Sequence, residues 1–378
     1  MENKFQYYLP VNIIFGSGKI NSVGDISRTY GSKALIVTGG NSAKKSGVYD
    51  CVKNCLVSVG IDTVLFDKVT QNPLTTTAVE GAAMAKEHNC NVVVAVGGGS
   101  VMDCAKAIAF LAINDGDIND YIFNIRNSDK ALPLILIPTT CGTGSEGNGF
   151  AVLTNPETGD KKSLRCNAII AKASIIDPEC MMTMPKNVLA SVGFDALCHN
   201  IEAYTSMIAQ PFTDALSLYA ISLIANNLTD VYNGKIEKSG WEKLTLASTI
   251  GGMVINTAGV TLAHGMEHPV SGLRNIVHGQ GLAALTPAII EASYKGNENK
   301  FKNIAKCFGG TCAEDCAKVI RNLLCEIDLA RTLSDLGIKE NDIPWLAENC
   351  IKVSAASVKN NPVVFTQGEI AELYGRCL

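Results

Sequence analysis

The chain has 378 residues, more than one hydrophobic core usually supports, so we expect two domains. Hydrophobic residues make up 47% of it and charged residues 18%, which argues against a disordered chain or a coiled coil. The 32 basic and 36 acidic side chains give a net charge of −4 with no block of like charge. Nucleic acid is therefore not an expected partner.

Targeting signals are not evident in the chain. No apolar run approaches the ~20 residues needed to cross a bilayer, and residues 1–8 lack the apolar core of a secretory signal. We therefore expect a cytoplasmic protein with no membrane partner. The fourteen cysteines are scattered, and we expect reduced thiols, mostly in the core. Cys312 and Cys316 form the one close pair that could be a metal or redox motif, although no second pair lies nearby.

The first half of the chain alternates short β runs with helical stretches, the pattern of a parallel sheet covered by helices. Each strand pattern stops where glycine or hydroxyl residues begin, and open α/β sheets bind ligands at these carboxyl ends. The predicted strands are residues 34–38, 91–96 and 134–137, and a helix is predicted over 101–111.

From about Thr183 onwards, apolar residues recur at three- and four-residue spacing, which predicts helices. The first opens at Thr183 or Pro185 and runs through Ile201. Further helices are predicted over residues 212–231, 241–268 and 314–329. The change of period alone divides the chain into an α/β domain, residues 1–182, and a helical domain, residues 183–378.

Four of the five histidines fall between residues 199 and 278, in the helical half. Asp195 and His199 are four residues apart, as are His264 and His268, so each pair shares one face of a helix. Imidazole nitrogens with one carboxylate oxygen suit Fe²⁺ or Zn²⁺. A core or surface role would explain any single histidine, but two such pairs together with His278 favour a metal centre. The fifth, His88, has polar neighbours and is expected to face solvent.

Two glycine- and threonine-rich segments follow predicted strands. Gly97-Gly-Gly-Ser100 precedes a predicted helix, a context in which backbone N–H groups can bind phosphate. A glycine triplet alone is equally typical of a tight turn, but Thr139-Thr-Cys-Gly-Thr-Gly-Ser145 adds hydroxyls at the same sheet edge. The usual Gly-x-Gly-x-x-Gly fingerprint is absent after the first strand. The residues alone therefore leave a nucleotide, a dinucleotide or a sugar phosphate open.

Taken together, four motifs in chain order resemble the iron-containing (group III) alcohol dehydrogenases over nearly the whole chain. They are Gly97-Gly-Gly-Ser-Val-Met-Asp-Cys-Ala-Lys106, Pro138-Thr-Thr-Cys-Gly-Thr-Gly-Ser-Glu146, Gly193-Phe-Asp-Ala-Leu-Cys-His-Asn-Ile-Glu-Ala-Tyr204, and His264-Gly-Met-Glu-His-Pro followed by His278-Gly. The resemblance implies a Rossmann-like, parallel-sheet dinucleotide-binding domain and an all-α domain, the two-domain architecture of dehydroquinate synthase. It also implies a divalent metal, with Fe²⁺ expected and Zn²⁺ as the alternative.

The resemblance assigns site residues by position. The metal ligands it implies are Asp195, His199, His264 and His278. His268 matches a histidine near the nicotinamide that is not usually a ligand. The implied cofactor contacts are Gly98, Gly99, Ser100, Asp103, Thr139, Thr140 and Lys161, with Asn72 on the adenosine side. Cys198 and Gly147-Asn148 depart from the family pattern, which leaves the substrate preference more open than the chemistry.

These inferences predict a metal-dependent alcohol dehydrogenase or aldehyde reductase that acts on a small primary alcohol or aldehyde with NADP(H) or NAD(H). His268 is the candidate catalytic residue, as a proton relay, with a purely orienting hydrogen bond as the alternative. A homodimer is expected. Two rival interpretations stay open: a metal-dependent lyase resembling dehydroquinate synthase, and a non-catalytic metal- or nucleotide-binding protein.

Two finer expectations concern charge. Gly39 stands where family members that prefer NAD often carry an aspartate, so NADP(H) is preferred, with Gly40, Asn41 and Ser42 as donors to a 2′-phosphate. Lys44 and Lys45 add positive charge nearby. Arg274 could pair with an anionic tail on the substrate, although a solvated surface arginine is the simpler interpretation.

Overall fold

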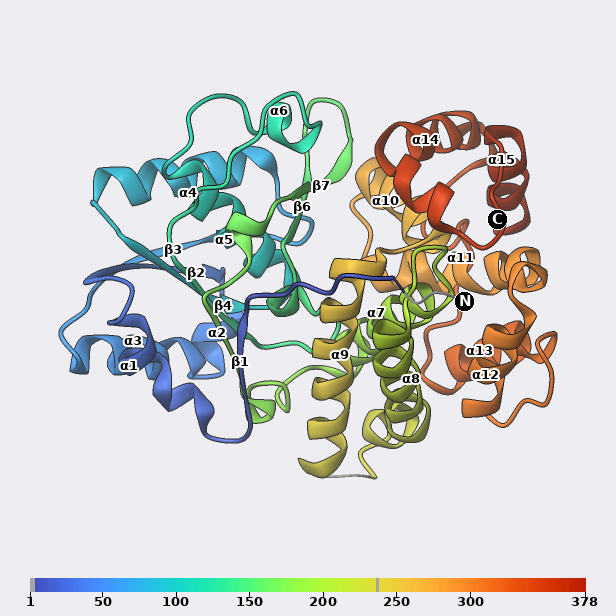
Figure 1. Cartoon of the computed structure of the whole chain (residues 1–378), viewed down its shortest axis with the longest axis horizontal. Coiled ribbons are helices and arrows are strands. Elements are labelled where there is room, and N and C mark those ends of the chain that lie inside the picture. The colour runs from blue at the N-terminus through green and yellow to red at the C-terminus, as the bar shows by residue number, and fades with distance from the viewer. Residues whose placement is uncertain (1–3, 236–237) are drawn as a thin grey trace. The chain divides into compact units, whose positions relative to one another are not determined.

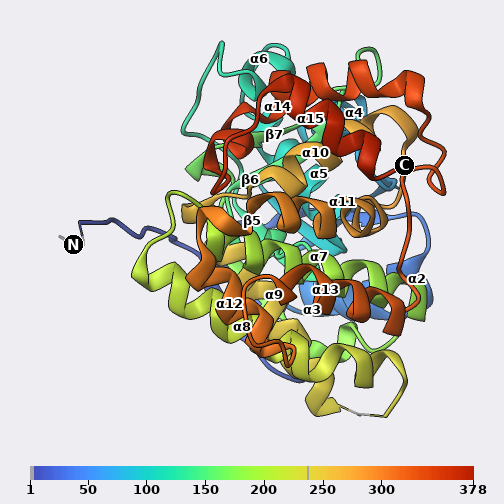
Figure 2. The ribbon, with the colours of Figure 1, turned by 90° about the vertical axis from the view of Figure 1, so that its right-hand side faces the viewer.

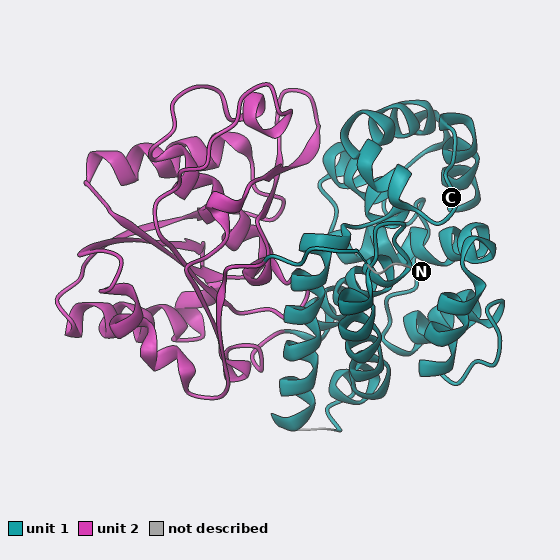
Figure 3. Cartoon of the chain, in the orientation of Figure 1, with its two compact units in different colours: residues 1–8, 185–378 teal, residues 9–184 magenta. Residues whose placement is uncertain are grey.

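The structure, a computed structural model, describes residues 4–235 and 238–378. The chain forms two compact units: Leu9–Met184, and Pro185–Leu378 together with the N-terminal segment ending at Tyr8 (Figure 3). The sequence-based division has its boundary at residues 182/183 and counts the N-terminal segment with the α/β domain.

The first unit is built on a parallel sheet in the order β1-β8-β5-β4-β2-β3 (Figure 1). The three strands predicted from the sequence are neighbours at its centre, so the turns that follow them lie side by side. This confirms the predicted parallel-sheet class. The strands are β1 (Asn12–Phe15), β2 (Lys33–Gly39), β3 (Asp62–Val69), β4 (Val92–Gly97), β5 (Leu134–Pro138) and β8 (Ala173–Ile176).

Both faces of this sheet are buried, because successive residues of each central strand point to opposite apolar clusters. In β2, Leu35 and Val37 face one cluster while Ala34 and Ile36 face the other. A separate antiparallel hairpin joins β6 (Phe150–Thr154) to β7 (Lys161–Arg165). The helices of this unit are α1 (Val23–Ser27), α2 (Ser42–Lys45), α3 (Val48–Ser58), α4 (Thr75–Glu87), α5 (Gly99–Leu111) and α6 (Ile118–Ile122).

The second unit is helical, as predicted, and α7 lies at its centre in contact with α8, α9 and α11. In Figures 1 and 2, α14 lies beside α10, with which it is in contact. The helices are α7 (Lys186–Thr205), α8 (Pro211–Tyr232), α9 (Lys238–Ala258), α10 (Leu262–Arg274), α11 (His278–Ser293), α12 (Glu298–Cys307), α13 (Asp315–Glu326), α14 (Ile343–Asn360) and α15 (Gln367–Arg376).

The single helix predicted over residues 241–268 is wrong, because the chain bends by 103° between α9 and α10. Gly259 adopts a left-handed φ of 67°, which ends α9. The Asn360 side chain donates to the carbonyls of Ala258 and Val260, at 2.8 and 3.1 Å. Apolar residues continue across the bend because both helices face the core. The helical spacing of apolar residues over 241–268 therefore gives no sign of the bend.

The sequence predicts neither a membrane-spanning helix nor disulfide bonds. Among the described residues, no single helix is long and apolar enough to cross a membrane; only α9 and α10 taken together pass a test of length and composition. All fourteen cysteines are free thiols. Cys312 and Cys316 belong to no cluster of potential metal ligands within residues 4–235 and 238–378.

Candidate active site

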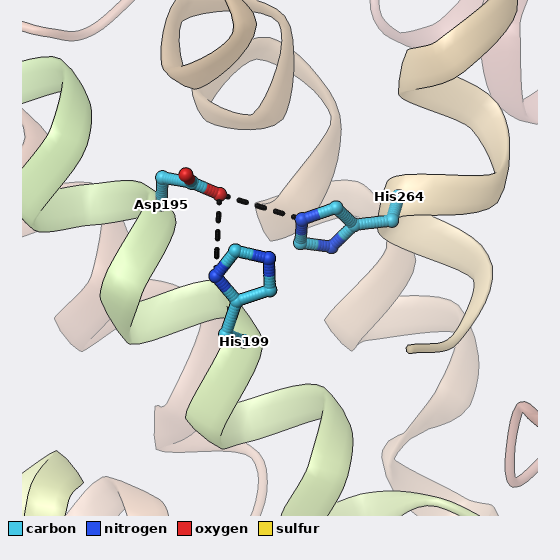
Figure 4. Close-up of side chains that lie close together, drawn as sticks. All are labelled: Asp195, His199 and His264. Carbon is cyan, nitrogen blue, oxygen red and sulfur yellow. Dashed lines mark ion pairs between the residues drawn. The ribbon is translucent and has the colours of Figure 1, made fainter. Parts of the chain in front are cut away.

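Three imidazoles, from three helices of the second unit, converge on one carboxylate oxygen. Oδ1 of Asp195 on α7 lies 3.4 Å from Nε2 of His264 on α10, 3.6 Å from Nδ1 of His199 and 3.7 Å from Nε2 of His278 on α11. Figure 4 shows one oxygen of Asp195 facing a ring nitrogen of His199 and a ring nitrogen of His264. The structure thus brings Asp195, His199 and His264 into one group of potential metal ligands. His278 lies within 3.7 Å of Asp195 but falls in a second group, with Glu267 and His268.

This arrangement fits a divalent ion. Ligand atoms bonded to a tetrahedral ion at about 2.1 Å stand roughly 3.4 Å from one another, close to the three distances from Asp195 Oδ1 to the imidazole nitrogens. Asp195 Oδ1 and His264 Nε2 are both buried and have no hydrogen-bond partner. Buried polar atoms in folded proteins are almost always satisfied, and a cation between these two would satisfy both.

A buried carboxylate that the sequence analysis did not assign holds the His264 ring in place. Glu202 Oε1 lies 2.5 Å from His264 Nδ1, and its Oε2 accepts the backbone N–H of Thr261 at 2.6 Å and of His264 at 3.3 Å. Glu202 therefore caps the start of α10 and orients one ring of the site. Such carboxylate partners fix the tautomer of a metal-binding histidine.

Glu267 plays the matching part for His278. Its Oε2 forms a close ion pair with His278 Nδ1, while its Oε1 accepts the Ser271 hydroxyl. Gly281 permits this approach, because a Cβ there would lie 2.9 Å from the Glu267 side chain. The sequence carried signals for both acids: Glu202 lies seven residues after Asp195, and Glu267 three after His264, spacings that share a helix face.

Close helix packing positions the remaining groups. A Cβ at Gly279 would lie 2.2 Å from the Ser191 carbonyl oxygen, so glycine lets the start of α11 approach α7. A Cβ at Gly251 would lie 3.3 Å from the His199 Cβ, so α9 packs directly behind that ring. The Gly279 contact sets the distance between α7 and α11, which carry His199 and His278, and the Gly251 contact supports α7 from α9.

The charges of the site are set by burial and by one another. Burial favours neutral Asp195, but the imidazoles of His199, His264 and His278 outweigh it and hold the pKa of this carboxyl well below its usual range. Burial lowers the pKa of His199 to about 4. Burial also opposes charge on His264, but the carboxylates of Glu202 and Asp195 outweigh it and raise the pKa of His264 to about 10.

These pKa values predict that metal binding releases about one proton at neutral pH. His264, with its pKa raised to about 10, carries two ring protons below that pH, whereas His199 is already neutral above about pH 4. The affinity for Fe²⁺ should therefore rise about tenfold per pH unit between about pH 7 and 8.5. Anaerobic competition against a chelator measures this slope; an affinity independent of pH would contradict it.

His268 lies on α10, one turn after His264, and is partly buried. Its ring stacks on that of His278, with the centroids 5.9 Å apart and an interplanar angle of 29°. Its position beside the cluster suits either expected role, proton relay or orientation. His88, by contrast, is exposed on the other unit.

Most of the predicted cofactor residues of the first unit lie at the carboxyl ends of β2, β4 and β5, while Asn72 follows β3 and Lys161 begins β7. Gly98 and Gly99 open α5, and Thr139 N–H donates to the Gly97 carbonyl at 3.1 Å. A Cβ at Gly99 would lie 2.3 Å from the Thr143 methyl group, so glycine lets the two turns interlock. Further predicted residues at these turns or on nearby elements are Gly39, Gly40, Asn41, Asn72, Ser100, Thr140 and Lys161.

Two of the expected charged groups have acidic partners inside the protein. Lys44 on α2 pairs with Asp67 on β3 at 2.5 Å, so the charge expected from Lys44 is balanced within the chain. Arg274 donates to both oxygens of Asp342, at 2.8 and 2.7 Å, in the turn η6 (Glu340–Asp342). This guanidinium is therefore paired within the chain, and its role towards an anionic substrate tail stays a prediction.

Comparison with known proteins decides the family. Residues 10–178 match the family model described as iron-containing alcohol dehydrogenase, and residues 189–378 match the C-terminal model of the same family. The chain belongs to the iron-containing alcohol dehydrogenase family. As in that family, it is a metal-dependent oxidoreductase that acts on CH–OH groups and uses a nicotinamide cofactor.

Individual relatives span the whole chain. It is 35% identical over 380 residues to the 1,3-propanediol dehydrogenase of Citrobacter freundii, covering 98% of each. It is 34% identical to alcohol dehydrogenase 4 of Saccharomyces cerevisiae, covering 97% of each. Among solved structures, an archaeal alcohol dehydrogenase from a Red Sea brine pool superposes with a TM-score of 0.96 at 32% identity, covering 100% of both chains. The relatives support the dehydrogenase over the lyase and over a non-catalytic protein.

Proposed function

We propose that the chain binds one Fe²⁺ through Asp195, His199, His264 and His278 and interconverts small primary alcohols and aldehydes with NADP(H). The observation that carries the ligand assignment is the buried Asp195 oxygen facing three imidazole nitrogens at 3.4–3.7 Å. The ion supplies a Lewis acid for the substrate oxygen, and the nicotinamide supplies the hydride chemistry.

The protein's own residues prepare this site. Glu202 holds a proton at Nδ1 of His264 and Glu267 holds one at Nδ1 of His278, which leaves Nε2 of both rings directed towards Asp195. His268 is proposed to move a proton at its ring nitrogens, a task suited to an imidazole near neutral pH. In this proposal residues 1–182 bind the dinucleotide, residues 183–378 hold the metal, and the protein acts as a cytoplasmic homodimer.

An activity assay tests the reaction. Anaerobically purified, iron-loaded protein should consume NADPH when small aldehydes are added, and removing the iron with a chelator should stop it. Iron-loaded protein that turned over none of a broad panel of aldehydes and alcohols would contradict the proposed substrate class. Turnover of a phosphorylated sugar acid without net consumption of dinucleotide would favour the lyase.

The cofactor preference rests on the end of β2. Gly39 has space for a side chain, since the atom nearest to a Cβ placed there would be the Val69 carbonyl oxygen at 3.4 Å, and nothing lies within 4 Å of one at Gly40. Without a carboxylate here, no like charge opposes a 2′-phosphate. Gly39→Asp should therefore shift the ratio of kcat/KM values towards NADH by roughly fivefold to a hundredfold, which corresponds to ~1–3 kcal/mol.

Steady-state kinetics with NADPH and NADH measure this ratio. Gly368→Asp is a matched control, because that glycine also has open space around it but lies on α15 of the helical unit. It should leave the ratio unchanged. A wild-type kcat/KM for NADH at or above that for NADPH would overturn the preference.

A further inference from the structure

Asp103 and Lys106 share one face of α5, one turn beyond the glycine turn, and both reach the segment that joins β5 to β6. Asp103 is expected from the family resemblance to contact the cofactor, whereas Lys106 has no assigned role. Their contacts within the first unit indicate a different task for both.

The Lys106 ammonium group is completely buried and surrounded by oxygen atoms of this segment. Its three N–H groups are shared among four oxygens: the Ser145 carbonyl at 2.6 Å, the Ser145 hydroxyl at 2.8 Å, the Asn148 side-chain oxygen at 3.0 Å and the Phe150 carbonyl at 2.7 Å. A buried cation is tolerated only when it is this well solvated by the protein. Asn148, one of the departures from the family pattern, supplies one of the four oxygens.

The Asp103 carboxylate completes the arrangement from the other side. Its Oδ1 accepts the Ser145 hydroxyl at 2.6 Å, and its Oδ2 accepts the Val152 N–H at 3.0 Å. The Ser145 hydroxyl thus bridges a buried ammonium group and a partly buried carboxylate, and each oxygen of Asp103 already has a partner within the chain. Hydrogen bonds to charged groups are the strong ones in such networks.

These contacts hold the segment between β5 and β6 in a position in which Thr140 and Thr143 contact the start of α5. A Cβ at Gly98 would lie 3.0 Å from Thr140 Oγ1, and one at Gly99 would lie 2.6 Å from Thr143 Oγ1. The threonine hydroxyls therefore stand directly beside the N-terminal turn of α5, where backbone N–H groups can receive a pyrophosphate.

We propose that Asp103, Lys106 and Ser145 form a clamp that positions the threonine turn against the start of α5, and so sets the affinity for the dinucleotide without touching it. The inference rests on the proposed function, because it assumes a dinucleotide at these turns. The three are positioning residues, and their effect is on binding of the pyrophosphate portion.

The test is calorimetric titration of the iron-loaded enzyme with NADPH, ADP-ribose and adenosine. Ser145→Ala should weaken NADPH and ADP-ribose binding roughly tenfold, because the bridge between two charges is lost. Adenosine, which lacks the pyrophosphate, should bind as before, and the iron content should not change. Ser174→Ala is a matched control: its buried hydroxyl donates to the Glu146 carbonyl of the same segment at 2.7 Å but lies outside the clamp. It should change NADPH affinity less than twofold.

A double variant separates positioning from direct contact. If Asp103 acts through Ser145, Asp103→Asn combined with Ser145→Ala should weaken NADPH binding no more than the stronger single variant. Additive losses would overturn the clamp and favour direct contact by Asp103. Unchanged affinity in Ser145→Ala, or equal losses in Ser174→Ala, would also overturn it. Failure of the wild-type enzyme to bind NADPH or ADP-ribose would instead refute the proposed function.

Discussion

Replacing His264 with alanine should remove both bound iron and turnover. The change deletes the ring whose Nε2 lies 3.4 Å from Asp195 Oδ1, and with it one of four proposed ligands. Losing a ligand should weaken iron binding by more than the roughly tenfold to hundredfold expected when only a ligand's supporting group is lost. The Glu202 bonds to the backbone N–H groups of Thr261 and residue 264 remain available, so α10 should still form.

Elemental analysis after anaerobic loading, together with the NADPH assay, measures both effects. His88→Ala removes an exposed histidine of the other unit and should leave iron content and rate unchanged. Full activity of His264→Ala with no bound metal would refute the ligand assignment.

Glu202→Gln should weaken iron binding by about 10–100-fold while the protein stays folded. The substitution keeps the size of the side chain but removes the charge that holds the proton at His264 Nδ1. Glutamine can still accept one backbone N–H at the start of α10, so the loss should appear in metal affinity more than in the free energy of unfolding.

Glu369→Gln provides a matched control for the capping part of this role. Glu369 accepts the N–H and hydroxyl of Thr366 at the start of α15, as Glu202 accepts those of Thr261, and α15 carries none of the proposed ligands. Chelator competition and denaturant unfolding on both variants separate the two effects. Equal iron affinity in Glu202→Gln and wild type would mean that the Glu202 carboxylate only caps the start of α10 and does not support the metal site.

Much of the fold could be predicted because its signals are local. Strands β2, β4 and β5 are nearly continuous apolar runs, which is what a sheet buried on both faces requires, and glycine or threonine residues lie at or just after their ends. Asp195 and His199 could be paired because four residues make one helical turn. Their convergence with His264 and His278 is now observed, while their role as ligands stays a prediction.

The side-chain roles that could not be predicted from the sequence depend on partners that are distant along the chain. Glu202 and Glu267 have a helical spacing to ligand residues, but that spacing alone does not distinguish them from other buried acids. Arg274 is balanced by Asp342, 68 residues away, and the position of that carboxylate follows from tertiary packing. Lys106 lies in a recognisable motif, yet its four oxygen partners come from a segment about 40 residues further on.

The corner between α9 and α10 has a consequence for when a newly made chain can acquire its metal. All four proposed ligands have been synthesised once residue 278 has left the ribosome. The corner that precedes α10, the helix of His264, is nevertheless stabilised by Asn360. Its side chain donates to the carbonyls of Ala258 and Val260, which lie 102 and 100 residues earlier in the chain. A nascent chain that stops before α14 therefore possesses every proposed ligand and the Glu202 that holds the His264 ring, but lacks the Asn360 bonds at the corner. Iron should accordingly be held at full affinity only once α14 has been made.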